Sequence, residues 1–487
     1  MGIVFKQSMS NTITTYLGFG IAAINTLFLY TNFLTDEYYG LVTVILSTSA
    51  ILMPVLAFGV PNTLVKYYSS FNDPEDSEGF HTLMLLLPLG LIIPLAGVAY
   101  FAYDAIGSFL SKENTIVKGY VWYIFLIGMA MAYFEVFYAW ARVQMKSVFG
   151  NFMKEVFNRI AVMALLFLVY FDVISVDFFL KALVGIYLLR TIIMKLYAYN
   201  LKIPRLNFRF PSNTRAILNY SALIILGGSA AIIILEIDKV MLNQFIKIEN
   251  VAYYGVAIYI AATIIVPSRS MHQITYPMTA ELLNKKDYPA LKSLYQKTSL
   301  TLFIVSGLLF ILIILNLNEI FLLIPEEYRG GFIIVFLIGL SKVYDSLLGN
   351  NNAILYNSDY YRSLLAMGVF LAVLVILFNL WLIPNYGLNG AAFGTFLAII
   401  IYNTVKLVYV KLKFGILPFT NETAKVFGIL LIISALFYFV ALPFHPILNI
   451  IIKSTAMCLL YAGILYRFKV SEDVYAVISK FLNRKTP

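Results

Sequence analysis

The stretch TSLTLFIVSGLLFILIILNLN, residues 298–318, contains no charged side chain. A helix that crosses the hydrocarbon core of a bilayer needs about 20 predominantly apolar residues, and this stretch supplies them without interruption. The whole chain has the same character, because 61% of its 487 residues are hydrophobic and only 12% are charged, with a mean hydropathy of +0.84. Soluble domains contain roughly 45–50% apolar and about 25% charged residues. The sequence therefore predicts an all-α, polytopic membrane protein with short connections.

Apolar stretches of this length recur along the chain, and we predict about fourteen transmembrane helices. Two pairs are separated only by short turns, at residues 171–177 and 442–446. The predicted spans lie near residues 12–33, 41–65, 82–103, 119–140, 156–172, 178–199, 217–237, 251–275, 298–318, 331–355, 363–383, 387–410, 423–442 and 447–466.

The basic residues indicate how these spans are oriented. With a cytoplasmic N-terminus, most of the 35 Lys and Arg residues fall in cytoplasmic connections, as the positive-inside rule requires. An even number of spans follows, with both termini in the cytoplasm and a cytoplasmic tail at 471–487. The net charge of +10 is then a consequence of topology, and we expect no nucleic-acid partner. The basic residues expected outside are Lys112, Lys118, Lys181, Lys239, Lys247, Arg329 and Lys453.

An internal repeat suggests how the helices are grouped. FLTDEYYGLV at 33–42 resembles FIKIENVAYYGVA at 245–257, and a proline-bearing helix follows each copy. The repeat unit contains about six helices, and because six is even, the two halves share one orientation, an arrangement in which a substrate path lies between two bundles. We expect a six-helix lobe at 1–200, a second lobe in parallel pseudo-repeat at 216–412, and two extra helices at 423–470.

Further short motifs follow one another in a distinctive order. Besides the two repeat copies, they are FGVPN at 58–62, EIDKVML at 236–242 and IPNYGLNGAA at 383–392. Together they resemble the polysaccharide flippases of the multidrug/oligosaccharidyl-lipid/polysaccharide exporter superfamily, over nearly the whole chain. The resemblance implies two six-helix lobes around a central, often cationic cavity. It implies that an undecaprenyl-diphosphate-linked oligosaccharide, a precursor of a polysaccharide, O-antigen or capsule, is moved outward by alternating access.

A transporter of this kind is not an enzyme, and the resemblance places it in the bacterial cytoplasmic (inner) membrane as a monomer. Its expected partners are the lipid-linked oligosaccharide, membrane lipids and a coupling ion, H⁺ or Na⁺. No glycine-rich loop followed by Lys-Ser or Lys-Thr occurs, so we expect no direct ATP hydrolysis. The single cysteine, Cys458, and the three histidines favour neither a metal site nor a cofactor.

Two other functions stay open. An ion-coupled small-molecule exporter of the same superfamily is expected to end near twelve spans, whereas this chain has two more. A membrane-embedded glycan polymerase or ligase generally needs a sizeable outward loop, and no predicted outward interval exceeds about fifteen residues. We therefore favour the flippase.

Basic residues at membrane depth are candidates for binding the substrate phosphates, because each ionisable group costs roughly 2.5–3.5 kcal/mol to insert and tends to mark a path. The candidates are Arg190, Arg269 and Lys342, since guanidinium and ammonium groups bind phosphates. Snorkelling to the cytoplasmic interface explains Arg190 and Arg269 equally well. For Lys342, an intrahelical ion pair with Asp345 one turn later is the equal alternative.

Acidic residues at the same depth are candidates for ion coupling or gating. They are Asp345, Glu236, Asp238 and Glu135. Glu236 and Asp238 lie near the outer end of their helix, where snorkelling is the favoured explanation. For Glu135, a structural contact is as good an explanation as proton coupling.

Buried amides complete the candidate site. Asn350 and Asn351 follow Asp345 by one to two turns and are candidates for a polar cavity wall, as is Asn25 in the first span. An asparagine in a membrane helix is more often an interhelical hydrogen bonder, and this alternative is favoured for Asn25.

Overall fold

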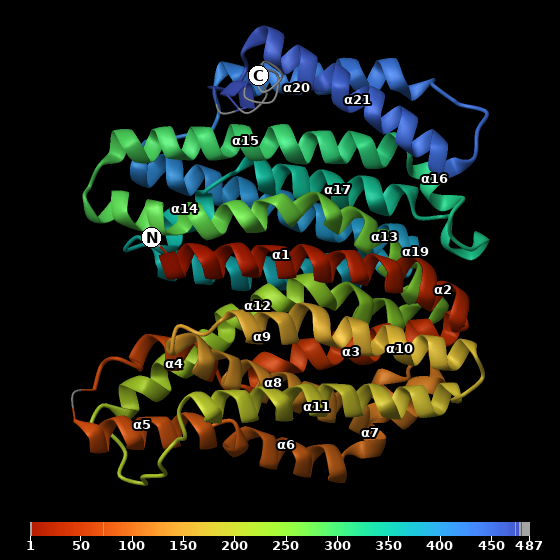
Figure 1. Cartoon of the computed structure of the whole chain (residues 1–487). Coiled ribbons are helices and arrows are strands. Elements are labelled where there is room, and N and C mark those ends of the chain that lie inside the picture. Colours follow the sequence, from red (N-terminus) through yellow and green to blue (C-terminus); the bar gives the residue numbers. More distant parts are fainter. Residues whose placement is uncertain (1, 72, 473, 477–478, 480–487) are drawn as a thin grey trace. The chain divides into compact units, whose positions relative to one another are not determined.

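The computed structural model describes residues 2–71, 73–472, 474–476 and 479 (Figure 1). It is 84% helix, and no strand occurs in this described part, which confirms the all-α prediction. Among the described residues, nine helical segments are long and apolar enough to cross a membrane, which is the composition of a multi-pass membrane protein. These segments are Ser10–Phe33, Asp36–Leu56, Pro74–Phe101, Thr115–Val143, Glu249–His272, Tyr288–Leu315, Tyr361–Phe414, Asn421–Tyr438 and Pro446–Phe468.

Every predicted span falls on one helix or on consecutive helices, some of which are separated by a short turn. The longest, α19 (Tyr361–Phe414), has 54 residues and contains two predicted spans. They are separated at Gly387, whose φ of 55° lies in the left-handed region, so the helix bends there. The total of fourteen crossings stays a prediction.

The chain divides into two compact units. Unit 1 consists of Met1–Gly255 and Gly368–Ala391, and therefore includes the middle of α19. Its other elements are α1 (Gly2–Ile24), the π-helix η1 (Asn25–Leu29), α2 (Tyr30–Phe33), α3 (Asp36–Leu56), α4 (Val60–Tyr67), α5 (Pro74–Leu86), α6 (Leu89–Phe101), α7 (Tyr103–Leu110), the 3₁₀-helix η2 (Thr115–Tyr120), α8 (Val121–Val143), α9 (Val148–Phe152), the π-helix η3 (Met153–Phe157), α10 (Asn158–Tyr170), α11 (Val176–Leu201), α12 (Thr214–Phe245) and the start of α13 (Glu249–Ala262).

Unit 2 consists of Val256–Met367 and Ala392–Pro487, and includes the rest of α13 and both ends of α19. Its other elements are the 3₁₀-helix η4 (Thr263–Ile265), α14 (Val266–Asn284), α15 (Tyr288–Leu315), α16 (Leu317–Phe321), the 3₁₀-helix η5 (Glu326–Tyr328), α17 (Phe332–Leu347), α18 (Asn351–Tyr356), α20 (Asn421–Tyr438) and α21 (Pro446–Phe468).

This division by contacts differs from the predicted lobe boundaries. Helix α12, which the repeat assigns to the second lobe, packs along α3 and α4 of unit 1. The middle of α19 also belongs to unit 1. The two units are therefore not the two repeats, and the arrangement of six-helix lobes stays a prediction.

Helix α3 shows how the sequence sets the ends of an element. The hydroxyl oxygen of Thr35 accepts a hydrogen bond from the backbone N–H of Tyr38, which caps the first turn, and the acidic residues that follow Thr35 complement the helix dipole. The helix ends before Gly59, whose φ of 64° is left-handed. The predicted single span 41–65 is consequently two helices, α3 and α4, separated by a turn.

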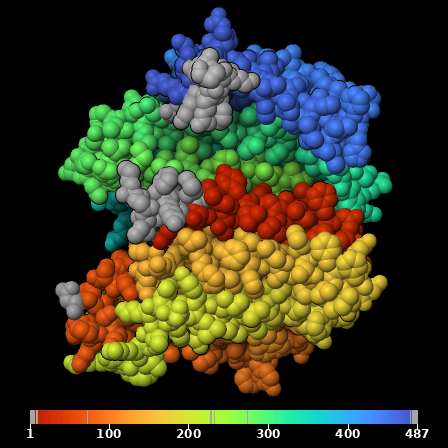
Figure 2. All heavy atoms as spheres, viewed as in Figure 1, coloured from red at the N-terminus to blue at the C-terminus, as the bar shows by residue number. Residues whose placement is uncertain are grey.

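The first helix packs along α9, η3 and α10 (Figures 1 and 2). Close approach requires a glycine, because a Cβ on Gly18 would lie 2.4 Å from the carbonyl oxygen of Glu155. The helix then widens into the π-turn η1, where buried Asn25 donates from Nδ2 to the Arg159 carbonyl at 2.8 Å. This interhelical hydrogen bond ties the N-terminal helix to α10.

Candidate functional site

A charged cavity of about 260 Å³ lies in unit 1 where α3 ends. Pro54 of α3 and Pro61 of α4 line it on either side of the α3–α4 turn, so the turn itself forms part of the wall. The polar lining residues are Asn62, Glu135, Arg142 and Lys154, and the remaining lining residues are Met53, Pro54, Ala57, Gly59, Pro61, Ile224, Ile225 and Ile232.

The centre of the charged cavity is an ion pair between two elements. Lys154 Nζ of η3 lies 2.6 Å from Glu135 Oε1 of α8. The carboxylate is the less exposed member, with 17% of its side chain accessible against 44% for the lysine. Glu135 therefore holds Lys154 at the cavity wall with a charge-assisted hydrogen bond.

Arg142 supplies a second cation to the same cavity. It lies seven positions after Glu135 on α8, so the two side chains share a helix face. Its guanidinium carbon lies 4.9 Å from the centroid of the Tyr138 ring, and its buried Nε has no hydrogen-bond partner among the described residues. Two cations and one carboxylate thus line the cavity, which gives it a net positive charge. The N–H of Arg142 Nε is a donor without a partner among the described residues.

Arg190 lies on α11 and is only 6% exposed. Its guanidinium carbon lies 4.1 Å from the ring centroid of Phe134 and 4.9 Å from that of Tyr187, a cation–π arrangement. Phe134 precedes Glu135 on α8, and Glu135 is within electrostatic reach of Arg190. Arg190 is not among the lining residues, so it contributes positive charge near the cavity without contacting the cavity itself.

Asp238 of α12 forms a second buried polar cluster in unit 1. Its Oδ2 accepts from the Tyr254 hydroxyl at 2.6 Å, and its Oδ1 accepts from Asn379 Nδ2 at 2.7 Å. The three side chains come from α12, α13 and α19. The carboxylate is buried, and both of these donors are neutral side chains.

Glu236 lies near Asp238 in sequence and has different partners. Its Oε2 accepts from the Ser47 hydroxyl of α3 at 2.7 Å and from Lys239 Nζ at 2.7 Å. The i,i+3 pair with Lys239 neutralises the acid within its own helix, and the bond to Ser47 joins α12 to α3.

Unit 2 contains the remaining charged candidates. Arg269 is exposed on α14, and Lys342 is half-buried on α17. Asp345 of α17 is paired with a residue that the sequence analysis did not select: Lys406 Nζ of α19 lies 3.9 Å from Asp345 Oδ1. The signal for Lys406 was present, since it is a single lysine inside the apolar stretch 387–410.

The asparagine run at the break between α17 and α18 connects three helices. Asn350 donates from Nδ2 to Thr279 of α14, and Asn351 donates to the Tyr295 hydroxyl of α15 at 2.7 Å. Asn352 Oδ1 accepts from Lys406 at 2.8 Å. Asn350 and Asn351 are fully buried. The ten predicted site residues therefore lie in both units, five in unit 1 (Asn25, Glu135, Arg190, Glu236 and Asp238) and five in unit 2 (Arg269, Lys342, Asp345, Asn350 and Asn351).

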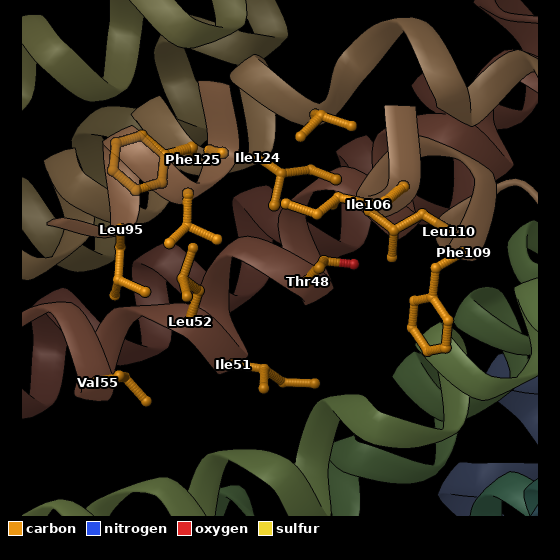
Figure 3. Close-up of a pocket in the computed structure, with 14 residues that line it drawn as sticks. Thr48, Ile51, Leu52, Val55, Leu95, Ile106, Phe109, Leu110, Ile124 and Phe125 are labelled. Carbon is orange, nitrogen blue, oxygen red and sulfur yellow. The ribbon is translucent and has the colours of Figure 1, made fainter. Parts of the chain in front are cut away.

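A larger cavity of about 600 Å³ in unit 1 has a different character (Figure 3). It lies between α3, α6, α7 and α8, and Thr48 supplies the one hydroxyl among its lining residues. That hydroxyl already donates to the Val44 carbonyl at 2.7 Å. The lining suits hydrocarbon and offers no charged group to a polar ligand.

In the part of the chain that the structure describes, no three or more His, Cys, Asp or Glu residues are grouped so that they could hold a metal ion.

Residues 4–283 match the family model described as "Polysaccharide biosynthesis protein". The chain belongs to this family. The matched residues include the lining of the charged cavity and Asp238. No curated protein matches the sequence.

The fold is shared with three solved structures of transporters. "Lipid II flippase MurJ, inward closed conformation" matches with a TM-score of 0.71 at 14% identity, over 96% of this chain and 100% of that chain. A multidrug resistance MATE family transporter of the MOP superfamily, in an inward-facing conformation, matches with a TM-score of 0.60 at 15% identity, over 85% and 95%. A MOP superfamily transporter from Pyrococcus furiosus matches with a TM-score of 0.57 at 14% identity, over 85% and 96%. The family match and this common fold confirm the resemblance that the sequence motifs indicated.

Proposed function

We propose that this protein is a flippase that moves an undecaprenyl-diphosphate-linked oligosaccharide outward across the bacterial cytoplasmic membrane by alternating access. The observation that carries the proposal is the charged cavity of unit 1. Arg142 and Lys154 face a single carboxylate, Glu135, and Arg142 Nε has no described partner. A transported diphosphate needs such a surplus of donors.

Each charged residue that lines the cavity has a role that suits the binding of a diphosphate. The planar guanidinium of Arg142 presents paired N–H donors to two phosphate oxygens, and Lys154 adds a compact positive charge. Glu135 holds Lys154 in place in the empty state. An arriving phosphate competes with Glu135 for the ammonium, so binding is reversible, as a transport site requires.

Family membership and fold support a lipid-linked cargo. The family is one of polysaccharide biosynthesis, and the structure with the TM-score of 0.71 is by its title a flippase of lipid II. That match covers 96% of this chain, whereas the MATE and Pyrococcus matches cover 85%. The cargo we propose combines a polyprenyl chain, a diphosphate and a glycan in one molecule.

Coupling to an ion is a second part of the proposal. Asp238 is a buried carboxylate that accepts from Tyr254 and Asn379. A proton would bind to one of its carboxylate oxygens, whereas Na⁺ would bind between these oxygens and the side-chain oxygens of Tyr254 and Asn379. Glu236 is paired with Lys239 and is the more exposed of the two acids, so we assign coupling to Asp238, which is 5% exposed. Ion-coupled export of a small molecule is the alternative function, and the match to a MATE transporter favours it.

The decisive experiment compares lipid-linked glycan on the two faces of the membrane after deletion of the gene. A flippase predicts that the undecaprenyl-linked glycan accumulates on the cytoplasmic face and that the wild-type gene restores its export. Arg142→Gln and Lys154→Gln should fail to restore export, whereas Lys146→Gln, an exposed lysine on the loop after α8, should restore it fully. Equal rescue by all three variants would remove the charged cavity from the mechanism. A normal distribution of the glycan in the deletion strain would favour the small-molecule exporter.

A further inference from the structure

Lys406 of α19 is a buried cation that the proposed transport site does not use. Its side chain is 1% exposed. Nζ donates to Asn352 Oδ1 at 2.8 Å and lies 4.4 Å from the centroid of the Tyr402 ring. An ammonium has three N–H donors, and a cation taken out of water needs both hydrogen bonds and an opposite charge. These two neutral contacts hold the ammonium in place but supply no negative charge.

The negative charge comes from Asp345, at a distance that leaves the pair incomplete. Asp345 Oδ1 lies 3.9 Å from Lys406 Nζ, which is too long for a hydrogen bond. The acid is 37% exposed, so the accessible group of the pair is the carboxylate and the enclosed group is the ammonium. Asp345 therefore compensates the positive charge of Lys406 but accepts no hydrogen bond from the Lys406 ammonium.

The surroundings of Asp345 are otherwise neutral or basic. His272 and Tyr276 of α14 and Tyr402 of α19 are within its electrostatic reach, and Lys342 lies one turn before it on α17. Among these described neighbours no second acid stands beside Asp345. If its carboxylate moves away, the environment left behind is one that attracts an anion.

The position of the ammonium is fixed by the asparagine run. Asn352 belongs to the segment whose other two members bond to Thr279 and Tyr295 on separate helices. The α17–α18 break itself is held by close packing, because a Cβ on Gly349 would lie 2.7 Å from the Ser299 nitrogen. Lys406 is therefore presented from a rigid background, and the adjustable member of the pair is Asp345.

We propose that Lys406 is an anion site of unit 2 for a phosphate-type oxyanion, and that Asp345 occupies the place of this anion when the site is empty. An arriving phosphate displaces the carboxylate and accepts the hydrogen bond that Asp345 is too distant to accept. Lysine binds phosphate as a compact charge, so one oxyanion suffices. The inference rests on the proposed function in that the cargo diphosphate is the expected source, but binding is measurable without transport.

The test is a titration of the full chain in phosphatidylcholine nanodiscs with inorganic pyrophosphate and with farnesyl diphosphate. An Arg142→Gln/Lys154→Gln background removes the contribution of the charged cavity. In this background Asp345→Asn should bind both probes about tenfold more tightly, because a competing like charge is lost. Lys406→Gln should weaken binding by about tenfold or more, and Lys406→Arg should retain it. Lys425→Gln, which removes a surface lysine paired with Glu422 at 2.7 Å, should change nothing.

The gain expected for Asp345→Asn cannot come from misfolding, so it decides the matter even if Lys406→Gln folds poorly. Unchanged or weaker binding by Asp345→Asn, or unchanged binding by a folded Lys406→Gln, overturns the inference. Displacement of pyrophosphate by added phosphatidylglycerol supports the site with a lipid headgroup as its ligand, and the absence of displacement supports it with the cargo diphosphate. Lys406-dependent binding together with a normal glycan distribution in the deletion strain would refute the proposed function alone.

Discussion

The hydroxyl of Tyr253 donates a 2.7 Å hydrogen bond to Asp36 Oδ2, and these two residues belong to the two copies of the internal repeat. Asp36 opens α3 and Tyr253 lies in the first turns of α13. The two copies of the repeat are therefore in contact in the folded protein as well as similar in sequence. The Tyr-Tyr-Gly of the first copy takes part as well, since Gly40 approaches the backbone of Ile248 in the second.

Tyr253→Phe should lower the stability of the protein measurably. The change removes a hydrogen bond to a partly buried carboxylate, and bonds to charged groups contribute about 1.5–3 kcal/mol. Thermal unfolding in detergent measures the loss. Tyr39→Phe is the matched control, because its hydroxyl donates to a neutral carbonyl, that of Thr26, at a longer 3.3 Å. An effect of Tyr39→Phe as large as that of Tyr253→Phe would contradict a special role for the contact between repeats.

Gly40→Ala should destabilise the protein strongly, although the substitution adds only a methyl group. A Cβ at Gly40 would lie 2.2 Å from the Ile248 carbonyl oxygen, and backbone cannot move aside as a flexible side chain can. We expect a loss of at least about 3 kcal/mol or a failure to accumulate folded protein. Gly97→Ala in α6 is the control, since nothing lies within 4 Å of its Cβ position and alanine is favoured over glycine by about 0.5–1 kcal/mol in a helix. Thermal unfolding of both variants in detergent should therefore move in opposite directions.

The positions of the helices could be predicted from the sequence because bilayer insertion depends on local composition. The predicted apolar stretches are helical apart from short turns, whereas their orientation from the basic loops stays a prediction. The α3–α4 turn could not be predicted from hydropathy, because the stretch through Gly59 is apolar. The left-handed conformation of Gly59 ends the helix there without any polar residue to mark the turn. The same applies to α12, whose packing partners α3 and α4 lie more than a hundred residues earlier in the chain.

Ionisable residues at membrane depth could be selected from the sequence but their pairings could not, and of the charged residues of the cavity Glu135 was selected but neither Arg142 nor Lys154. Glu135 was selected for its depth, yet its partner Lys154 belongs to a segment expected to be a cytoplasmic connection. For Asp345, an ion pair with Lys342 one turn away was one of two equal alternatives, and the structure shows an ion pair with Lys406 on another helix. An ionisable residue at membrane depth is visible in the sequence, whereas its counter-charge depends on helix packing.

Asp238→Asn should abolish any dependence of transport on H⁺ or Na⁺. The amide keeps the size of the carboxylate but cannot neutralise a cation, so an ion that binds beside Tyr254 and Asn379 loses its counter-charge. Uptake or flipping in proteoliposomes, with and without an ion gradient, measures the dependence. Glu236→Gln, which alters the acid already paired with Lys239, is the control and should retain ion dependence. Loss of the dependence in Glu236→Gln but not in Asp238→Asn would move the coupling site.

The side-chain amide of Asn114, which is 8% exposed, both donates and accepts hydrogen bonds, so substitutions that remove one or both functions should have different effects. Its Nδ2 donates to the carbonyl of Asn243 at 2.8 Å and to that of Ile246 at 2.9 Å, while its Oδ1 accepts from the Ile248 N–H at 2.9 Å. One side chain thus joins the connection after α7 to the connection after α12. Replacement by alanine leaves buried groups unpaired, at a cost of about 1–3 kcal/mol.

Asn114→Asp should be worse than Asn114→Ala, although aspartate has nearly the shape of asparagine. The carboxylate still accepts from Ile248, but it turns a second oxygen toward two carbonyl oxygens and brings a charge into a buried site. Thermal unfolding should rank the wild type first, alanine second and aspartate last. Asn385→Ala, which removes an exposed amide bonded within its own helix to Trp381, should stay within about 0.5 kcal/mol of the wild type. A ranking with aspartate above alanine would mean that the bond to Ile248 alone holds this connection and that the two donor bonds contribute little.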